Sequence, residues 1–262
     1  MQPVRLTALA LLFAAPLVAQ QPDFRWEKVI AAGSTVSAHN LNGNVSVTPA
    51  SGNKVEVVGI KHGNRRYFDD VTIEVVETSR GVMICSMFKH ADMECDESGF
   101  HMHDRHGWND RDYDDVSIDI EVKVPRGMQV DAHSVSGDVS VVGAEGRVRA
   151  GSVSGDVRME RLRASSVNAS SVSGNVTVGV ESLDGDGPLR FTSVSGNVTA
   201  ELPKGIDADV TMRTVSGSLD SDFPLTLNGR VSRSSLEARI GKGGRDLEVR
   251  TVSGDVRLRA AK

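Results

Sequence analysis

A six-residue repeat in the second half of the chain constrains the fold more than any other feature. Each copy reads Ser or Thr, Val, Ser, Gly, then Asp, Asn or Ser, then Val or Leu. Clear copies begin at Ser134, Ser152, Ser171, Ser193, Thr214 and Thr251. Their glycines are 18, 19, 22, 21 and 37 residues apart. Such a period indicates one small unit stacked many times, because a single unit of this size cannot bury its apolar face alone.

Two weaker copies extend the pattern. Residues 40–45 form an early copy, Asn-Leu-Asn-Gly-Asn-Val. The last step of 37 residues has room for one more unit, and residues 235–240 fit there with Ala238 in place of the glycine. We therefore expect regular repeats over residues 131–262.

Each copy has the pattern of a β-strand. In the first copy Val135, Gly137 and Val139 alternate with polar residues, which is typical of a half-buried strand. A glycine within such a strand marks a bend or a close backbone approach. We expect two buried aliphatic ladders across the stack. The first holds Val135, Val153, Val172, Val194, Val215, Leu236 and Val252. The second holds Val139, Val157, Val176, Val198, Leu219, Ile240 and Val256.

These observations predict an all-β, single-domain β-solenoid, similar to a β-helix, built from stacked coils of about 20 residues. An aromatic content of only 4% fits a thin core lined by valine. The alternative is an antiparallel sandwich of hairpins, which gives no reason for near-identical hexamers at nearly even spacing.

The N-terminus has the pattern of an export signal. Arg5 precedes an apolar run that is too short to span a bilayer, and small residues follow at Val18 and Ala19. We expect a signal peptide over residues 1–19 and a mature chain over residues 20–262 that is periplasmic, on the cell surface or secreted. No cysteine follows the run as a lipid anchor, and no later segment is long and apolar enough to span a membrane. A net charge of −5 argues against nucleic acid as a partner.

Residues 86–115 break the repeat pattern. They hold nine acids against three basic residues, together with His90, His101, His103 and His106. We find no strand alternation there and expect an irregular acidic loop insert. Imidazoles suit Zn, Cu and Ni, so these four histidines are candidate ligands for Cu or Zn. The alternative is a solvated loop whose histidines titrate near pH 6.5.

Cys85 and Cys95 are the only cysteines. In an exported protein an even pair indicates a disulfide, which would need Cα atoms within about 7 Å of each other.

No catalytic motif is present, and we identify no catalytic or cofactor-binding residues. Gly151-Ser152-Val153-Ser154-Gly155 lacks the central Ser of a nucleophile elbow. Asp184-Gly185-Asp186-Gly187 lacks the other ligands of a calcium loop. The recurring acids Asp138, Asp156 and Asp255 are interpreted as solvated turn residues.

The hexamers resemble those of a bacterial β-strand-repeat family of candidate adhesins of unknown biochemical function. That family is similar in plan to the head-domain group of candidate autotransporter adhesins. Residues 240–256 and 116–125 resemble its C-terminus and the strand before its repeats. The resemblance covers most of residues 30–262, and the acidic insert lies outside it. It implies an exported β-solenoid of the cell envelope and transfers no catalytic residues.

The sequence therefore predicts a non-enzymatic envelope or surface protein, an adhesin-like scaffold or interaction module. Its partner would be an envelope protein or a glycan. Two alternatives stay open. One is a β-helical carbohydrate-active enzyme, and the other is periplasmic binding of Cu or Zn through the histidine-rich insert.

Overall fold

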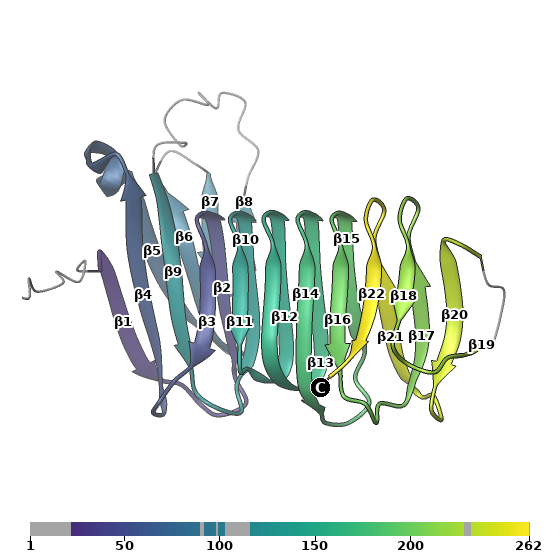
Figure 1. The fold of residues 1–262 in the computed structure, drawn as a ribbon. Coiled ribbons are helices and arrows are strands. Elements are labelled where there is room, and N and C mark those ends of the chain that lie inside the picture. The colour runs from purple at the N-terminus through teal and green to yellow at the C-terminus, as the bar shows by residue number, and fades with distance from the viewer. Residues whose placement is uncertain (1–21, 90–91, 98, 103–115, 228–231, 262) are drawn as a thin grey trace, which may run out of the picture.

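The chain winds into a stack of flattened coils, seen in a computed structural model that describes residues 22–89, 92–97, 99–102, 116–227 and 232–261 (Figure 1). In these residues twenty strands form one continuous sheet, and two more form a small hairpin. The predicted all-β solenoid is confirmed. Residues 1–21, which contain the predicted signal peptide, lie outside the described residues. No helix in the described ranges is long and apolar enough to cross a membrane.

The coils present two faces, named here as they lie in Figure 1. The rear face carries β6 (Gly81–Phe88), β2 (Thr35–Asn42), β10 (Gln129–Ser136), β12 (Glu145–Ser154), the second half of β13 (Val157–Ser173), β15 (Leu189–Ser195), β21 (Arg245–Arg250) and β17 (Ala208–Arg213). The front face carries β9 (Val116–Val124), β3 (Val45–Pro49), β11 (Val139–Val142), the first half of β13, β14 (Val176–Leu183), β16 (Val198–Leu202), β22 (Val256–Ala260) and β18 (Leu219–Ser221).

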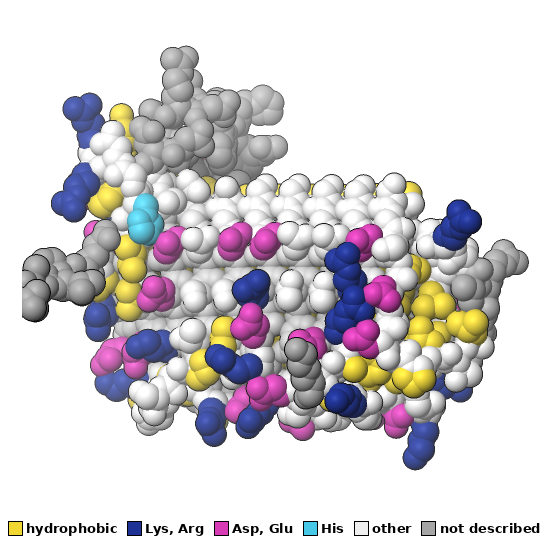
Figure 2. Space-filling view, viewed as in Figure 1, with side chains coloured by type: hydrophobic (Ala, Val, Ile, Leu, Met, Phe, Trp, Pro, Cys, Tyr) yellow, Lys and Arg dark blue, Asp and Glu magenta, His cyan; other side chains and the backbone are white. Residues whose placement is uncertain are grey.

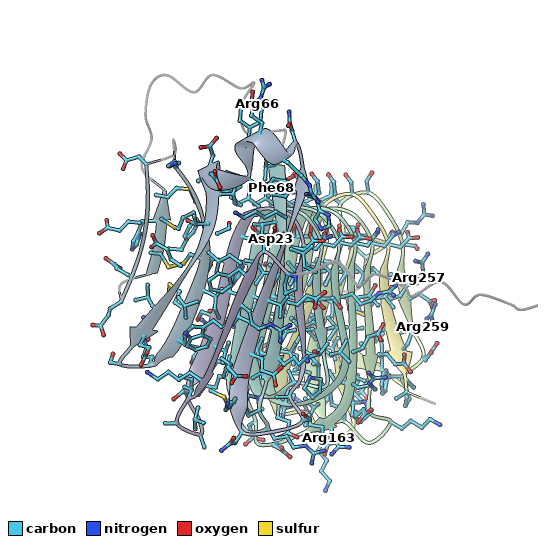
Figure 3. The ribbon with its side chains drawn as sticks, turned by 90° about the vertical axis from the view of Figure 1, so that its left-hand side faces the viewer. Asp23, Arg66, Phe68, Arg163, Arg257 and Arg259 are labelled. Atoms are coloured by element: carbon cyan, nitrogen blue, oxygen red, sulfur yellow. A yellow bond between two sulfur atoms is a disulfide. The ribbon has the colours of Figure 1, made fainter. Side chains whose placement is uncertain are left out.

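Further elements close the two ends of the stack. At the N-terminal end lie β1 (Phe24–Val29), β4 (Lys54–Gly63), η1 (Arg65–Asp70) and β5 (Val71–Thr78). Figure 3 looks onto this end, where Arg66 and Phe68 mark η1 and the side chains of successive coils align in rows. At the other end lie β19 (Thr226–Leu227) and β20 (Ser235–Ile240).

The hexamer forms the arch that joins the two faces of each coil. Hydrogen bonds between coils explain why its first residue is Ser or Thr. The hydroxyl of that residue points inward and donates to a glycine carbonyl of the neighbouring coil. The pairs are Ser134–Gly43, Ser152–Gly137, Ser171–Gly155, Ser193–Gly174, Thr251–Gly196 and Thr214–Gly254, at 2.8 to 2.9 Å. These bonds allow a buried hydroxyl at a position that would otherwise favour an apolar side chain.

The fourth residue must be glycine because the arches stack in contact. A Cβ added to Gly174 would lie 2.1 Å from the carbonyl oxygen of Gly155, and Gly196 has the same relation to Gly174. No side chain can occupy that space, so the glycine recurs in every full arch.

The fifth residue forms a second ladder. Its backbone N–H donates to the side-chain oxygen of the fifth residue in the adjacent coil toward the N-terminal end of the stack, at 2.7 to 3.0 Å. The pairs are Asp138–Asn44, Asp156–Asp138, Asn175–Asp156, Asn197–Asn175, Asp255–Asn197 and Ser218–Asp255. Figure 2 shows a row of acidic side chains near the upper edge of the coils, on the side where the arches lie. Asp138 and Asp156 are exposed, as expected, whereas Asp255 is half-buried, and all three also hold the coils together.

One of the two predicted core ladders is wrong. The second residue of each full hexamer lies outside the core, and the exposed fractions of Val135, Val153, Val172, Val194, Val215 and Val252 run from 37% to 77%. Leu236 is half-buried against the core, but it lies on β20 and not in a ladder. In the strand that leads into each arch, every second side chain points into the core, and the last of these is the first residue of the hexamer. The valine that follows therefore points outward. The second ladder is confirmed for Val139, Val157, Val176, Val198 and Val256, which are buried, whereas Leu219 is only half-buried. Ile240 is also buried, but it lies on β20, outside the ladder.

The order of coils in the stack also differs from the order of copies in the chain. The last copy, at residues 251–256, lies between the copies at residues 193–198 and 214–219, because β21 and β22 pair with strands of both. The predicted coil at residues 235–240 is wrong. Those residues form β20, which runs antiparallel to β17 and protects the open edge of the stack.

The insert is ordered where the structure describes it. β7 (Met93–Asp96) and β8 (Gly99–Met102) form an antiparallel hairpin, so an irregular loop throughout residues 86–115 is wrong for this part. A disulfide joins Cys95 of the hairpin to Cys85 of β6, with Cα atoms 6.3 Å apart, as the predicted pairing requires. The bond attaches the hairpin to the rear face.

Candidate functional site

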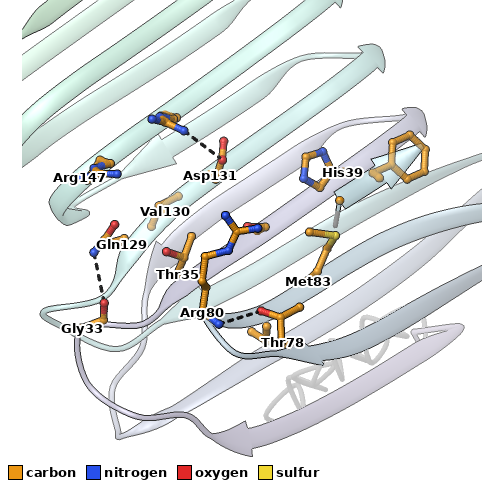
Figure 4. A pocket seen from close by; sticks show the side chains of 15 residues that line it. Gly33, Thr35, His39, Thr78, Arg80, Met83, Gln129, Val130, Asp131 and Arg147 are labelled. Atoms are coloured by element: carbon orange, nitrogen blue, oxygen red, sulfur yellow. Dashed lines mark hydrogen bonds and ion pairs between the residues drawn. The ribbon is translucent and has the colours of Figure 1, made fainter. Parts of the chain in front are cut away.

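A cleft of about 550 Å³ lies on the rear face beside the attached hairpin (Figure 4). Its floor consists of β2 and β10, its rim on one side is β12, and on the other side it meets the β5–β6 turn and the hairpin. The described lining residues are Gly33, Thr35, Ser37, His39, Thr78, Arg80, Val82, Met83, Gly99, Phe100, Gln129, Val130, Asp131, Arg147 and Arg149.

The floor is polar because every second residue of each strand points away from the core. The parallel register places Gln129 beside Thr35, and Asp131 beside Ser37. Arg149 lies beside Asp131 on the next strand. Residues from distant parts of the chain therefore meet in rows across the floor. Both floor strands are hydrogen-bonded to a neighbour on each side, β2 to β6 and β10, and β10 to β2 and β12.

Three guanidinium groups surround this floor. Arg147 and Arg149 are exposed on the same side of β12, and Arg80 extends from the β5–β6 turn toward Thr35 (Figure 4). Arg80 donates to the backbone carbonyl of Glu97 at 3.4 Å. Among the residues that the structure describes, Arg147 makes no hydrogen bond or ion pair through its side chain.

Asp131 is the single acid among the described lining residues. Its Oδ1 lies 2.7 Å from Nε2 of His133, and its Oδ2 lies 4.0 Å from Nη1 of Arg149. Burial acts to raise the pKa of Asp131, but the hydrogen bond from His133 and the nearby positive charges outweigh it and lower that pKa. Asp131 is therefore an anion held by His133, and it compensates only part of the arginine charge.

A stack of three rings forms the upper wall of the cleft. The ring of His39 lies between Phe100 and His133, with centroids 5.7 Å and 5.4 Å apart and near-parallel planes. Burial and the neighbouring His133 lower the pKa of His39 from 6.5 to about 4, so this imidazole is neutral at neutral pH. The disulfide positions the wall, because it attaches the hairpin that carries Phe100.

The predicted metal ligands do not come together in the described residues. His101 lies on β8, opposite Glu94 in register, and its side chain is exposed. His90, His103 and His106 lie outside the described residues. Within the described ranges no group of three or more His, Cys, Asp or Glu residues is placed to hold a metal ion. Binding of Cu or Zn by the insert stays a prediction.

The sequence interpretation missed the cleft, although two signals for it were present. Arg147 and Arg149 are two apart in a strand, which places both on one side. His39 and His133 occupy the same position before their copies of the hexamer, so stacked copies bring them side by side. No local pattern indicates Arg80 or Phe100, which reach the cleft through the turn and the hairpin.

A second hollow of about 580 Å³ lies among the loops after β14, after β16 and before β21. Arg245 is one of its lining residues. This guanidinium donates to the backbone carbonyls of Ser165, Gly185 and Gly187. Its donors are used within the fold, so the residue fixes the loop between β14 and β15 to β13 rather than facing a ligand.

A family model and a solved structure of similar fold match the chain over most of its length. The family model described as Toastrack DUF4097 matches residues 34–259. A candidate cell adhesion protein from Clostridium sporogenes is similar in structure, with a TM-score of 0.54 and 9% identity over 92% of this chain and all of that one. A candidate adhesin from Bacteroides fragilis has a TM-score of 0.41 and 10% identity over 91% of this chain and 96% of that one. No curated protein sequence matches the chain significantly.

Proposed function

The chain belongs to the Toastrack DUF4097 family, and from this premise we propose that it is an exported, non-enzymatic, adhesin-like module that binds an envelope partner in its rear-face cleft. The observation that carries the proposal is the set of Arg80, Arg147 and Arg149 around a polar floor that supplies one partly shared acid. Exposed guanidinium groups around a hollow, with a single acid to offset their charge, are suited to recognition.

The remainder of the rear face and the whole stack then act as a rigid support. Ladders of hydrogen bonds join successive arches, so the strands that carry the cleft are fixed relative to one another. Sites built on such paired strands are held more rigidly than sites on loops. The likeness to a candidate cell adhesion protein supports the adhesin-like part of the proposal.

The chemistry of the cleft favours binding over catalysis. Hydrolysis of a glycosidic bond normally uses two carboxyl groups that flank the bond. The described lining contains one, Asp131, which His133 already holds at 2.7 Å. The export part of the proposal is supported by the pattern of residues 1–19 and by a disulfide, which is stable in oxidising compartments.

The proposal is tested with the full chain expressed in a bacterial host. We expect the exported protein to begin at residue 20, as read by N-terminal sequencing. The purified mature protein should bind isolated bacterial envelopes saturably and release no sugar from them. Uncleaved protein retained in the cytoplasm, absence of envelope binding, or turnover of envelope polysaccharide would each contradict a part of the proposal.

A further inference from the structure

We propose that the ligand of the cleft is an acidic glycan, whose carboxylates contact Arg147, Arg149 and Arg80 and whose hydroxyls contact the polar floor. This inference rests on the proposed function and names the chemical class of its partner. It is carried by the charge of the cleft, by the spacing of its arginines and by the pairing of its floor strands.

The arginines of the cleft differ from several others on the two faces of the coils, which are paired with acids. On the front face Arg257 pairs with Asp255 at 2.7 Å, and Arg259 pairs with both Asp220 and Asp222 at 2.8 Å (Figure 3). On the rear face beyond the cleft, Arg190 lies within 3.5 Å of two acids. By contrast, Arg147 has no acid within ion-pairing distance in the described residues, and Arg149 reaches Asp131 only at 4.0 Å. The cleft thus concentrates positive charge in a chain whose net charge is −5.

The spacing of these groups suits a chain of linked anions rather than one small ion. Arg147 and Arg149 are alternate residues of one strand, so their Cα atoms are about 7 Å apart. Arg80 lies across the floor from them (Figure 4). Guanidinium groups bind carboxylates through two parallel hydrogen bonds, which fixes direction as well as charge. The volume of about 550 Å³ exceeds the space that one carboxylate needs.

The floor favours a glycan over an acidic peptide. Extended peptides are commonly recognised through the unpaired backbone of a sheet edge. Here β2 and β10 are each paired on both sides, so the floor presents side chains and no open edge. Those side chains include Thr35, Ser37 and Gln129, which can exchange hydrogen bonds with sugar hydroxyls. The ligand must therefore supply polar groups of its own beside its carboxylates.

The test uses the mature protein with three probes: galacturonic acid oligomers, the same oligomers as methyl esters, and polyglutamate of equal charge. Calorimetry should show binding of the free-acid oligomer only. The Arg147→Gln/Arg149→Gln variant should bind it at least about tenfold more weakly, since hydrogen bonds between charged groups are lost. The matched variant Arg158→Gln/Arg163→Gln loses the same charge outside the cleft, where Arg158 pairs with Glu160 and Arg163 with Glu181. It should bind within about twofold of the wild type, and thermal melts should show that both variants fold.

Each other result overturns the inference in a different way. Equal binding of the methyl esters removes the role of the carboxylates. Equal or tighter binding of polyglutamate indicates an acidic peptide instead. An equal loss in the matched variant indicates attraction by overall charge alone. If the wild type binds isolated envelopes but none of the three probes, the acidic glycan is excluded while the proposed function stands. If the wild type binds neither the envelopes nor any probe, both the acidic glycan and the proposed function are excluded.

Discussion

The imidazole rings of His39 and His133 lie stacked on neighbouring strands, with centroids 5.4 Å apart and planes inclined by 8°. The two residues are 94 positions apart in the chain, and the register of β2 with β10 places them side by side. Phe100 covers the other side of His39. Through this stack the disulfide-bound hairpin forms the cleft wall and lowers the pKa of the half-buried His39.

We expect the folded state to lose stability as the pH falls from about 6.5 to about 4. The pKa of His39 is about 4 in the folded protein and near 6.5 when unfolded, so between these values the unfolded chain binds a proton that the folded chain does not. The contribution of neutral His39 to the free energy of unfolding is complete above pH 6.5. It decreases by roughly 3 kcal/mol at most as the pH falls to 4. Unfolding midpoints across this range should show the loss in the wild type. His39→Phe keeps a ring in the stack and should show a flatter profile; an unchanged profile would contradict the assignment to His39.

Reduction of the disulfide should release the hairpin and return the pKa of His39 toward 6.5. The hairpin shields His39 through Phe100, and burial is the largest cause of the lowered pKa. In Cys85→Ser/Cys95→Ser the global stability should fall by about 3 kcal/mol, the chain-entropy value for a loop of this length. NMR titration of His39 measures the first effect, and hydrogen exchange over residues 93–102 measures release. A pKa that stays near 4 would show that the hairpin remains in place without the bond.

Val172 and Val176 belong to the same hexamer, but the same substitution should destabilise the protein far more at Val176 than at Val172. Val176 is fully buried, so Val176→Asp should cost several kcal/mol because an unpaired carboxylate enters the core. Val172 is 46% exposed, and Val172→Asp should cost less than about 1 kcal/mol. Chemical denaturation of the two variants compares them directly. Equal destabilisation would mean that the outward valines are also part of the core.

Gly174→Ala should destabilise the stack by about 3 kcal/mol or more. The new methyl would lie 2.1 Å from the carbonyl oxygen of Gly155, a contact that neighbouring backbone cannot relieve without moving the arches apart. Gly52→Ala is the matched control, because nothing lies within 4 Å of its added methyl. Thermal unfolding of both variants measures the difference, and similar midpoints would refute the close stacking of the arches.

Much of the fold follows from the repeat alone, because period-2 alternation and even spacing depend only on nearest neighbours. The burial of Val139, Val157, Val176, Val198 and Val256 in the second ladder follows correctly for this reason. The first ladder, which begins at Val135, was predicted to be buried and is exposed. Whether Val135 or Ser134 points inward depends on a hydrogen-bond partner for the hydroxyl, and that partner is Gly43 of another coil.

The cleft could be predicted only in part. The positions of Arg147 with Arg149 and of His39 with His133 follow from strand alternation and aligned copies. Arg80 and Phe100 do not follow, because a turn and a hairpin outside the repeat carry them to the cleft. The insert that carries Phe100 shows no pattern in its own sequence, since the Cys85–Cys95 bond and the rear face hold it in place.

The sequence by itself determined the stacked all-β architecture, the recurring glycine and the pairing of the two cysteines, since each depends on local period, backbone space or compartment. Only the tertiary structure decided the order of the coils, in which residues 251–256 lie between two earlier copies. It also decided the antiparallel cap at β20 and the gathering of three arginines around one floor. The physical reason is that near-identical copies are interchangeable as neighbours. Their order is selected by the loops between them and by the need to cover the open ends of the stack.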